Sequence, residues 1–180
     1  MSGKVVLCFC LASSCALVLG GAVTSRPGLR PVEDFTVRPI VAPFKLSEQK
    51  GKFVALHFLL KTECPYCIRH THEYASRAAE LPNVVQVFLK PDPEAEVLRW
   101  MSSYNRSGGA LPVIYRDPDA TLARRFGIPD GYRFHNENVH YPALVLIDPQ
   151  GQEVFRYVGK NNTDRFSFDQ LKAKIKELAP

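Results

Sequence analysis

Two cysteines, Cys64 and Cys67, are the residues of this sequence whose types and spacing could most readily do chemistry. They enclose a proline and a tyrosine in the segment Cys64-Pro65-Tyr66-Cys67. Cysteines at this spacing can form a working dithiol, half of a metal site, or a disulfide that only staples a turn. A disulfide between them closes a very short loop, so it removes little entropy from the unfolded chain and stabilises the fold weakly.

The surroundings of the two cysteines favour redox chemistry. The apolar residues 53–60 predict a buried strand, and the apolar residues after Cys67 recur at helical spacing, so the cysteines lie where a helix begins. Free backbone N–H groups and the helix dipole stabilise a thiolate there, and the thiolate is the nucleophile in disulfide exchange. We therefore expect Cys64 to attack a disulfide and Cys67 to resolve it, with Pro65 at the first helical position.

Charged neighbours would modulate this thiolate. Lys61, Arg69, His70 and His72 would favour it if their side chains reach the sulfur, whereas Glu63 would oppose it.

A metal site is the second interpretation of the same segment. Cys67 and His70 are one helical turn apart, and His140 lies two residues before Pro142, so a copper or zinc site could be assembled from them. Histidines on a helix are more often solvated surface residues than ligands, and His57, inside an apolar strand, is expected to be a core histidine with satisfied hydrogen bonds. Redox exchange through the dithiol needs no organic cofactor.

The elements around the cysteines predict an α/β fold. Further strands are expected at residues 84–89, 111–115, 143–147 and 153–158, the last two forming a hairpin. Helices are expected after Cys67, at 94–104, from Asp117 to a stop at Gly127, and after a capping box formed by Ser167 and Gln170. Residues 129–139 read as a polar loop. This alternation of elements is typical of a three-layer sandwich.

Composition and the N-terminus indicate an exported protein of one domain. The chain has 180 residues, 46% of them hydrophobic, and a net charge of +5 without the long runs of like charge found in nucleic-acid-binding arms. Residues 1–25 hold a single Lys4 and then an uncharged apolar run from 5 to 23, which predicts a signal peptide or, alternatively, a membrane anchor or lipid-attachment segment. A linker at 26–43 and a domain at 44–180 would follow.

The predicted export segment contains three of the five cysteines. Cys8, Cys10 and Cys15 lie inside the N-terminal segment, so the mature domain would keep only Cys64 and Cys67. A periplasmic or secreted location is one where disulfides form and persist.

Four segments together resemble the thioredoxin-like superfamily, and within it the exported redoxins that include TlpA- and ResA-like oxidoreductases and the AhpC/TSA peroxiredoxins. They are FKLSEQKGKFVALHFLL, the CPYC turn, LPVIYRDPDATLARRFGI and YPALVLIDPQGQEVFRYVGK. The resemblance covers roughly residues 35 to 178. It implies a thioredoxin-like α/β/α sandwich with a central mixed β-sheet.

The resemblance also implies a substrate groove. A cis proline in this superfamily faces the dithiol, and the matching residue is Pro142, preceded by Tyr141. Tyr141 would offer its backbone groups to an incoming chain, and Pro65 and Tyr66 would line the same groove. Residues 129–140 form a longer connection than is usual, either a partner-selecting lid or a surface decoration.

We therefore expect an exported thiol–disulfide oxidoreductase that acts on protein thiols and disulfides and is reset by a redox partner protein. The alternatives are a metal-binding or metal-delivery module and a thiol peroxidase. Peroxiredoxins carry a threonine three residues before the attacking cysteine, and Lys61 occupies that position here.

Overall fold

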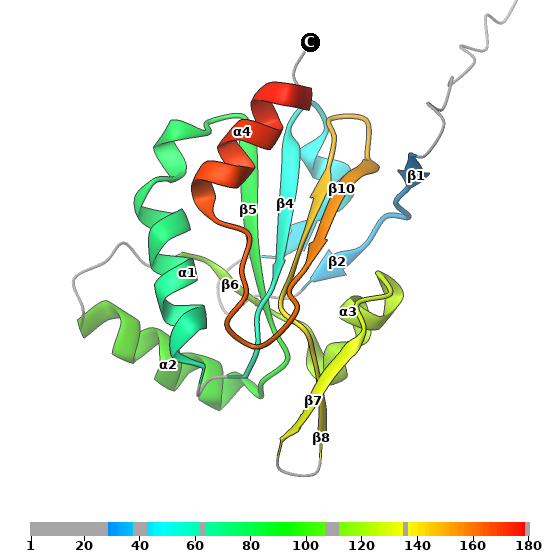
Figure 1. Ribbon diagram of the computed structural model, residues 1–180. Coiled ribbons are helices and arrows are strands. Elements are labelled where there is room, and N and C mark those ends of the chain that lie inside the picture. Colours follow the sequence, from blue (N-terminus) through cyan, green and yellow to red (C-terminus); the bar gives the residue numbers. More distant parts are fainter. Residues whose placement is uncertain (1–28, 38–42, 62–63, 107–111, 135–136, 179–180) are drawn as a thin grey trace, which may run out of the picture.

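A mixed sheet of six strands forms the centre of the molecule (Figure 1). The computed structural model describes residues 29–37, 43–61, 64–106, 112–134 and 137–178. The strands lie in the order β1 (Arg30–Pro31), β10 (Gln152–Val158), β9 (Ala143–Ile147), β4 (Phe53–Phe58), β5 (Val84–Lys90) and β6 (Ile114–Arg116). β4, β5 and β6 are parallel, whereas β9, β10 and β1 alternate in direction.

Helices α1 (Pro65–Ser76), α2 (Glu94–Arg106) and α4 (Phe168–Leu178) lie on one face of the sheet (Figure 1). α1 and α2 connect parallel strands that step in one direction across the sheet, and right-handed crossovers then put both helices on the same side. Helix α3 (Thr121–Arg125), the 3₁₀ turn Leu46–Gln49 and the antiparallel pair β2 (Thr36–Val37) and β3 (Phe44–Lys45) cover the other face. The predicted three-layer arrangement with a mixed sheet is confirmed.

Each face of the sheet has its own apolar core, because every residue of β4 is buried and successive side chains point to opposite faces. The helical face includes Ala55, Cys67 and Phe168, and the other face includes Leu56, Phe126 and Val145. Cys67 is thus a core residue as well as a candidate catalytic group.

Local signals predicted most elements well. Gly127 has the left-handed backbone expected at the end of a helix, with φ of +64°. At the start of α4, the Ser167 amide donates to Gln170 Oε1 at 2.8 Å and the Gln170 amide donates to Ser167 Oγ at 3.3 Å, which is the predicted capping box. The helix expected from Asp117 is divided into a 3₁₀ turn (Pro118–Ala120) and α3.

The polar connection before β9 is a β-hairpin rather than a loop. Strands β7 (Asp130–Phe134) and β8 (Glu137–His140) pair antiparallel and project from the body of the molecule (Figure 1). Val139 is buried, but Arg133 and Asn138 are exposed. With so little apolar surface to bury, the segment lacks the alternation by which a strand is recognised in sequence.

Part of the segment expected to be a linker belongs to the domain. β1 extends the sheet by pairing with β10, and Phe35 and Val37 are buried in the core beside α3. These apolar side chains have a partner surface only once the sheet has formed, so composition alone suggested a linker.

The predicted export segment, residues 1–25, lies outside the described residues, and its role stays a prediction. Within the part of the chain that the structure describes, no helix has both the length and the apolar character needed to cross a bilayer.

Candidate active site

The two cysteines occupy the turn between β4 and α1, as predicted. Cys64 is the N-cap residue of α1 and Pro65 is its first residue, where the missing N–H costs no hydrogen bond. The Cys67 amide donates to the Cys64 carbonyl at 3.1 Å, which closes the first turn. Both residues are free thiols; Cys64 is partly exposed, whereas Cys67 is completely buried. Only Cys64 is therefore accessible to a large substrate.

Arg165 contacts both sulfur atoms, and sequence reasoning missed it. Its Nη2 lies 3.4 Å from Cys64 Sγ and 3.5 Å from Cys67 Sγ. Arg165 is about one hundred positions away from the cysteines in the chain, in the connection between β10 and α4. A guanidinium in this position stabilises negative charge on either sulfur.

The connection that carries Arg165 is held in place by its own hydrogen bonds. Arg165 Nη1 donates to the carbonyls of Asn162 and Asp164 at 2.9 and 3.0 Å, and Asp164 accepts from the Tyr157 hydroxyl at 2.6 Å. Gly159 is required at the start of this connection, because a Cβ there would lie 2.5 Å from the Asp164 carbonyl oxygen. The arginine is thereby preorganised beside the dithiol.

The thiols share one proton between them. The hydrogen bond with Cys67 and burial raise the pKa of Cys64. Burial also disfavours the Cys67 thiolate, but the hydrogen bond from Cys64 and the charges of Lys90 and Arg165 outweigh it and lower the pKa of Cys67 to about 6. At neutral pH the pair therefore carries one negative charge, and because the two groups are coupled, its first and second proton losses belong to the pair.

A pair of buried histidines lies beneath the first turns of α1. His57 Nε2 is 2.7 Å from Gln86 Oε1, and His57 Nδ1 is 3.0 Å from His70 Nε2. If Gln86 Oε1 accepts, His57 is protonated at Nε2, so that His70 Nε2–H must donate to His57 Nδ1. The prediction that His57 is a satisfied core histidine is confirmed, whereas treating His70 as a solvated surface residue was wrong.

Both histidines are held in the neutral form. Burial lowers the pKa of His57 to about 4 despite its hydrogen bond to Gln86. Burial, His57 and Arg165 lower the pKa of His70. His70 and Arg165 also share a small cavity of about 10 Å³ with Pro142, which is about the size of one water molecule.

One expectation about the groove, the cis peptide bond before Pro142, needs correction. The described residues contain no cis peptide, so Tyr141–Pro142 is trans. The β7–β8 hairpin determines the approach to β9, because the Tyr141 amide donates to the Pro129 carbonyl at 3.0 Å and His140 Nδ1 is 2.8 Å from the Tyr141 carbonyl. Both backbone groups of Tyr141 thus already have a partner within the chain.

Pro142 also has a structural role. It is buried, and its carbonyl accepts from the Gly159 amide at 2.8 Å, which braces the connection that carries Arg165. Of the other predicted groove residues, Pro65 and Tyr66 are exposed beside Cys64, and the Arg69 guanidinium lies 5.6 Å from the Tyr66 ring centroid. Substrate contacts by Pro65, Tyr66, Tyr141 and Pro142 stay a prediction.

A cleft of about 530 Å³ opens at the end of the sheet where β4 and β5 finish. It begins at Lys61, three residues before Cys64, and the β7–β8 hairpin forms one wall through Asp130, Asn138 and His140. The other walls come from the beginning of α2 and from the α3 region, including Glu96 and Arg124. The cleft is large enough for several side chains of a substrate.

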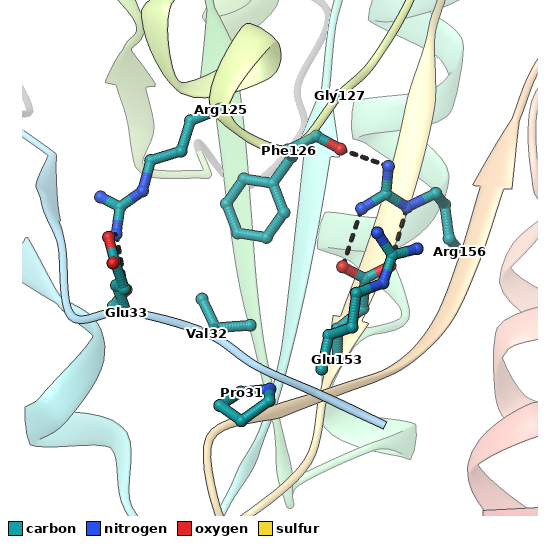
Figure 2. Close-up of a pocket in the computed structure, with 9 residues that line it drawn as sticks. Pro31, Val32, Glu33, Arg125, Phe126, Gly127, Glu153 and Arg156 are labelled. Carbon is teal, nitrogen blue, oxygen red and sulfur yellow. Dashed lines mark hydrogen bonds and ion pairs between the residues drawn. The ribbon is translucent and has the colours of Figure 1, made fainter. Parts of the chain in front are cut away.

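A second pocket, shown in Figure 2, lies away from the dithiol on the face covered by α3. Arg125 Nη2 donates to Glu33 Oε2 at 2.9 Å, and Arg156 forms two 2.7 Å hydrogen bonds to the Glu153 carboxylate and a third to the Phe126 carbonyl. These arginines hold the chain around Glu33 and strand β10 against the end of α3, so we assign the pocket a structural role.

Two of the histidines considered for a metal site already have hydrogen-bond partners. Among the described residues, no three side chains of histidine, cysteine, aspartate or glutamate are grouped so that they could hold an ion. His70 Nε2 is engaged with His57, and His140 Nδ1 with the Tyr141 carbonyl.

Comparison with known proteins identifies the family. The AhpC/TSA family matches residues 30–154, which include the dithiol and most of the sheet. The chain belongs to the AhpC/TSA family. No curated protein matches the sequence significantly.

Solved peroxiredoxins share the fold of this AhpC/TSA protein. A yeast mitochondrial 1-Cys peroxiredoxin, studied for its thiol resolving mechanism via glutathione/thioredoxin systems, superposes with a TM-score of 0.71 at 14% identity, covering 83% of this chain and 74% of the other. A cysteine-to-serine mutant of the peroxiredoxin 6 of Arenicola marina gives 0.74 at 17% identity, with 83% and 71% covered. The expected thioredoxin-like fold is therefore confirmed, and the family supports a thiol-based redox function.

Proposed function

We propose that this protein is a thiol–disulfide oxidoreductase in which Cys64 attacks and Cys67 resolves. One observation carries the proposal: an accessible sulfur and a sealed sulfur lie one helical turn apart, and a single guanidinium contacts both. An unpaired structural thiol would not need that arrangement. A dithiol in exchange needs it, because negative charge moves from one sulfur to the other during the reaction.

The reaction starts with a proton shift. In the resting pair Cys64 holds the proton and Cys67 the charge; transfer of the proton to Cys67 makes the accessible sulfur the thiolate. Cys64 Sγ then forms a bond to one sulfur of the substrate disulfide, whose S–S bond breaks. The leaving thiolate takes the proton from Cys67. Cys67 Sγ attacks Cys64 Sγ, and the second substrate thiolate leaves and is protonated by water. The substrate gains two electrons, which the two cysteines lose when they form the Cys64–Cys67 disulfide.

Protein disulfides are the proposed substrates, and a second redox protein would reset the pair. The cleft beside Lys61 is bounded by Asp130, Asn138 and His140 of the β7–β8 hairpin, which supports a role for the hairpin in substrate binding. The apolar residues 5–23 support a location outside the cytoplasm.

Trapping tests this assignment. Cys67→Ser is expected to accumulate a mixed disulfide between Cys64 and a protein disulfide substrate such as insulin, because the resolving thiol is missing. Mass spectrometry of the non-reduced complex would locate the bond. The matched variant Cys64→Ser should form no adduct, since Cys67 is sealed. An adduct on Cys67, or none in either variant, would refute the assigned roles.

A thiol peroxidase is the second candidate, favoured by Arg165 and by the family. Cys64 thiolate would attack the terminal oxygen of a hydroperoxide and break the O–O bond; the alkoxide that leaves, or hydroxide from hydrogen peroxide, is protonated by water. Cys67 would then condense with the Cys64 sulfenic acid to give the disulfide and water. Arg165 is close enough to both sulfurs to stabilise the developing charge.

Sulfenic acid trapping separates the two candidates. If the protein is a peroxidase, Cys67→Ser treated with stoichiometric hydrogen peroxide should retain a dimedone-reactive sulfenic acid on Cys64 within seconds. If it is chiefly an oxidoreductase, insulin disulfides should react at least about tenfold faster than peroxide does, because Lys61 replaces the threonine of peroxiredoxins. Rapid loss of peroxide with no exchange on insulin would favour the peroxidase.

A further inference from the structure

One buried donor beside the dithiol lacks a protein partner. Arg165 uses Nη1 for the carbonyls of Asn162 and Asp164 and Nη2 for the two sulfur atoms. Its third nitrogen, Nε, is buried and has no hydrogen-bond partner among the residues that the structure describes. Buried polar groups almost always have a partner, either in the protein or in an ordered water. The Nε–H group therefore indicates a ligand that is not a protein atom.

A cavity lined by the Arg165 side chain has room for such a ligand. Its volume is about 10 Å³, which accommodates one water molecule. Apolar groups form most of its wall, and the lining side chains that carry nitrogen or oxygen are those of Arg165, His70 and Tyr157. The Tyr157 hydroxyl already donates to Asp164 at 2.6 Å. Arg165 and His70 are therefore the two side chains that can bind a water in this cavity.

His70 can supply the acceptor that complements the arginine donor. Its Nε2 lies 3.0 Å from His57 Nδ1 and, with Gln86 Oε1 accepting from His57 Nε2, His70 Nε2 carries the proton. The other ring nitrogen, Nδ1, is then an unprotonated acceptor. One water can bridge a donor on Arg165 and an acceptor on His70, because it accepts at its oxygen and donates through its hydrogens.

We propose that this cavity is a water site and that His70 is a positioning residue, which through the bound water holds the Arg165 guanidinium against both sulfurs. The hydrogen-bonded chain runs from Gln86 through His57 and His70 to the water and on to Arg165. Because the guanidinium is held in advance, it needs no reorganisation when a thiolate forms. The proposal rests on the proposed thiol chemistry and deepens it, and it applies to both candidate functions, since both use the Cys64 thiolate.

The water can be detected directly in the wild-type protein by nuclear magnetic resonance. The Arg165 Hε signal, identified by its loss in Arg165→Lys, should show a rotating-frame Overhauser contact with a water that stays bound longer than surface hydration does. Absence of that contact would overturn the proposal. The measurement needs no substitution at His70, so it decides the matter even if variants of His70 fold poorly.

Removing the acceptor tests the role of His70. His70→Leu is expected to raise the pKa of the dithiol, measured from the pH dependence of iodoacetamide alkylation, by about 0.5–1 unit, because a loosely held guanidinium stabilises the thiolate less. Alkylation below pH 6 should then slow about three- to tenfold. His70→Gln keeps one donor and one acceptor, so it should retain the wild-type profile. The water contact of Arg165 Hε should be lost in His70→Leu and kept in His70→Gln.

His57→Leu is the matched control. It breaks the same bond between the two histidines in the same part of the core, but it leaves His70 in the wall of the cavity. Its alkylation profile should therefore match that of the wild type. A wild-type profile in His70→Leu, or equal shifts in the two leucine variants, would overturn the proposal. Neither measurement uses a disulfide or peroxide substrate, so their outcomes are separate from the trapping experiment that tests the proposed function.

Discussion

Replacing Arg165 by methionine is expected to slow the reaction of Cys64 with disulfides about tenfold below pH 6 and to accelerate it above pH 9. A hydrogen bond to a charged group contributes about 1.5–3 kcal/mol, so its loss should raise the pKa of the pair by about one to two units. Less thiolate is then present in acid. In base both proteins are ionised, and the more basic thiolate is the better nucleophile, with a Brønsted coefficient of about 0.4–0.5.

The rate of single-turnover disulfide exchange, measured across pH 5–10, shows whether the profiles of Arg165→Met and wild type cross. Arg165→Lys should recover part of the acid-side rate, because it keeps a charge but cannot reproduce the planar contact with both sulfurs. Arg69→Met is the matched control: Arg69 is an exposed arginine of α1 that stacks on Tyr66, and its loss should leave the profile unchanged. Parallel profiles of the Arg165→Met and wild-type proteins, offset by a constant factor, would mean that Arg165 does not set the thiolate pKa.

Acid should unfold this protein through its buried histidines. Burial lowers the pKa of His57 from 6.5 to about 4 and also lowers those of His70 and His140. The unfolded chain therefore binds more protons than the folded one between these values. The stabilisation is complete above pH 6.5 and is lost as pH falls toward 4. His57 alone accounts for about 3 kcal/mol, because each pKa unit corresponds to about 1.36 kcal/mol.

Urea unfolding between pH 4 and pH 7.5 tests this expectation. Each such histidine adds up to about 1.4 kcal/mol per pH unit to the slope of the free energy of unfolding. In His57→Gln the slope should be smaller by the contribution of one proton. This variant should also be less stable than the wild type at pH 7.5. His72→Gln, which changes an exposed histidine of α1, should keep the wild-type slope. An unchanged slope in His57→Gln would show that His57 is not held neutral by burial.

Much of the site could be predicted from local sequence. The apolar run ending at Leu60, the Pro65 that follows Cys64 and the helical spacing after Cys67 each depend on neighbours within a turn or a strand. Such signals are short-range, so they identified the strand, the helix start and the dithiol together. The same reasoning located the capping box at Ser167 and the left-handed Gly127.

The hairpin and the trans Tyr141–Pro142 bond were not predictable in this way. The register of β7 and β8 depends on backbone pairing by polar residues, which leaves little trace in hydrophobic periodicity. The Tyr141–Pro142 bond is trans, and the Tyr141 amide donates to the Pro129 carbonyl. The expectation of a cis bond came from the family resemblance alone and not from the residues around Pro142.

By itself, the sequence determined which residues can react: Cys64 and Cys67 are paired by their spacing, and the elements on either side put them at a helix start. Only the tertiary structure decided what charges surround them. Arg165 comes from a connection about one hundred residues later, and Lys90 from the neighbouring strand. Polar side chains at these positions resemble any surface arginine or lysine in sequence, because a charge acts through space and its reach depends on burial and distance, which folding alone defines.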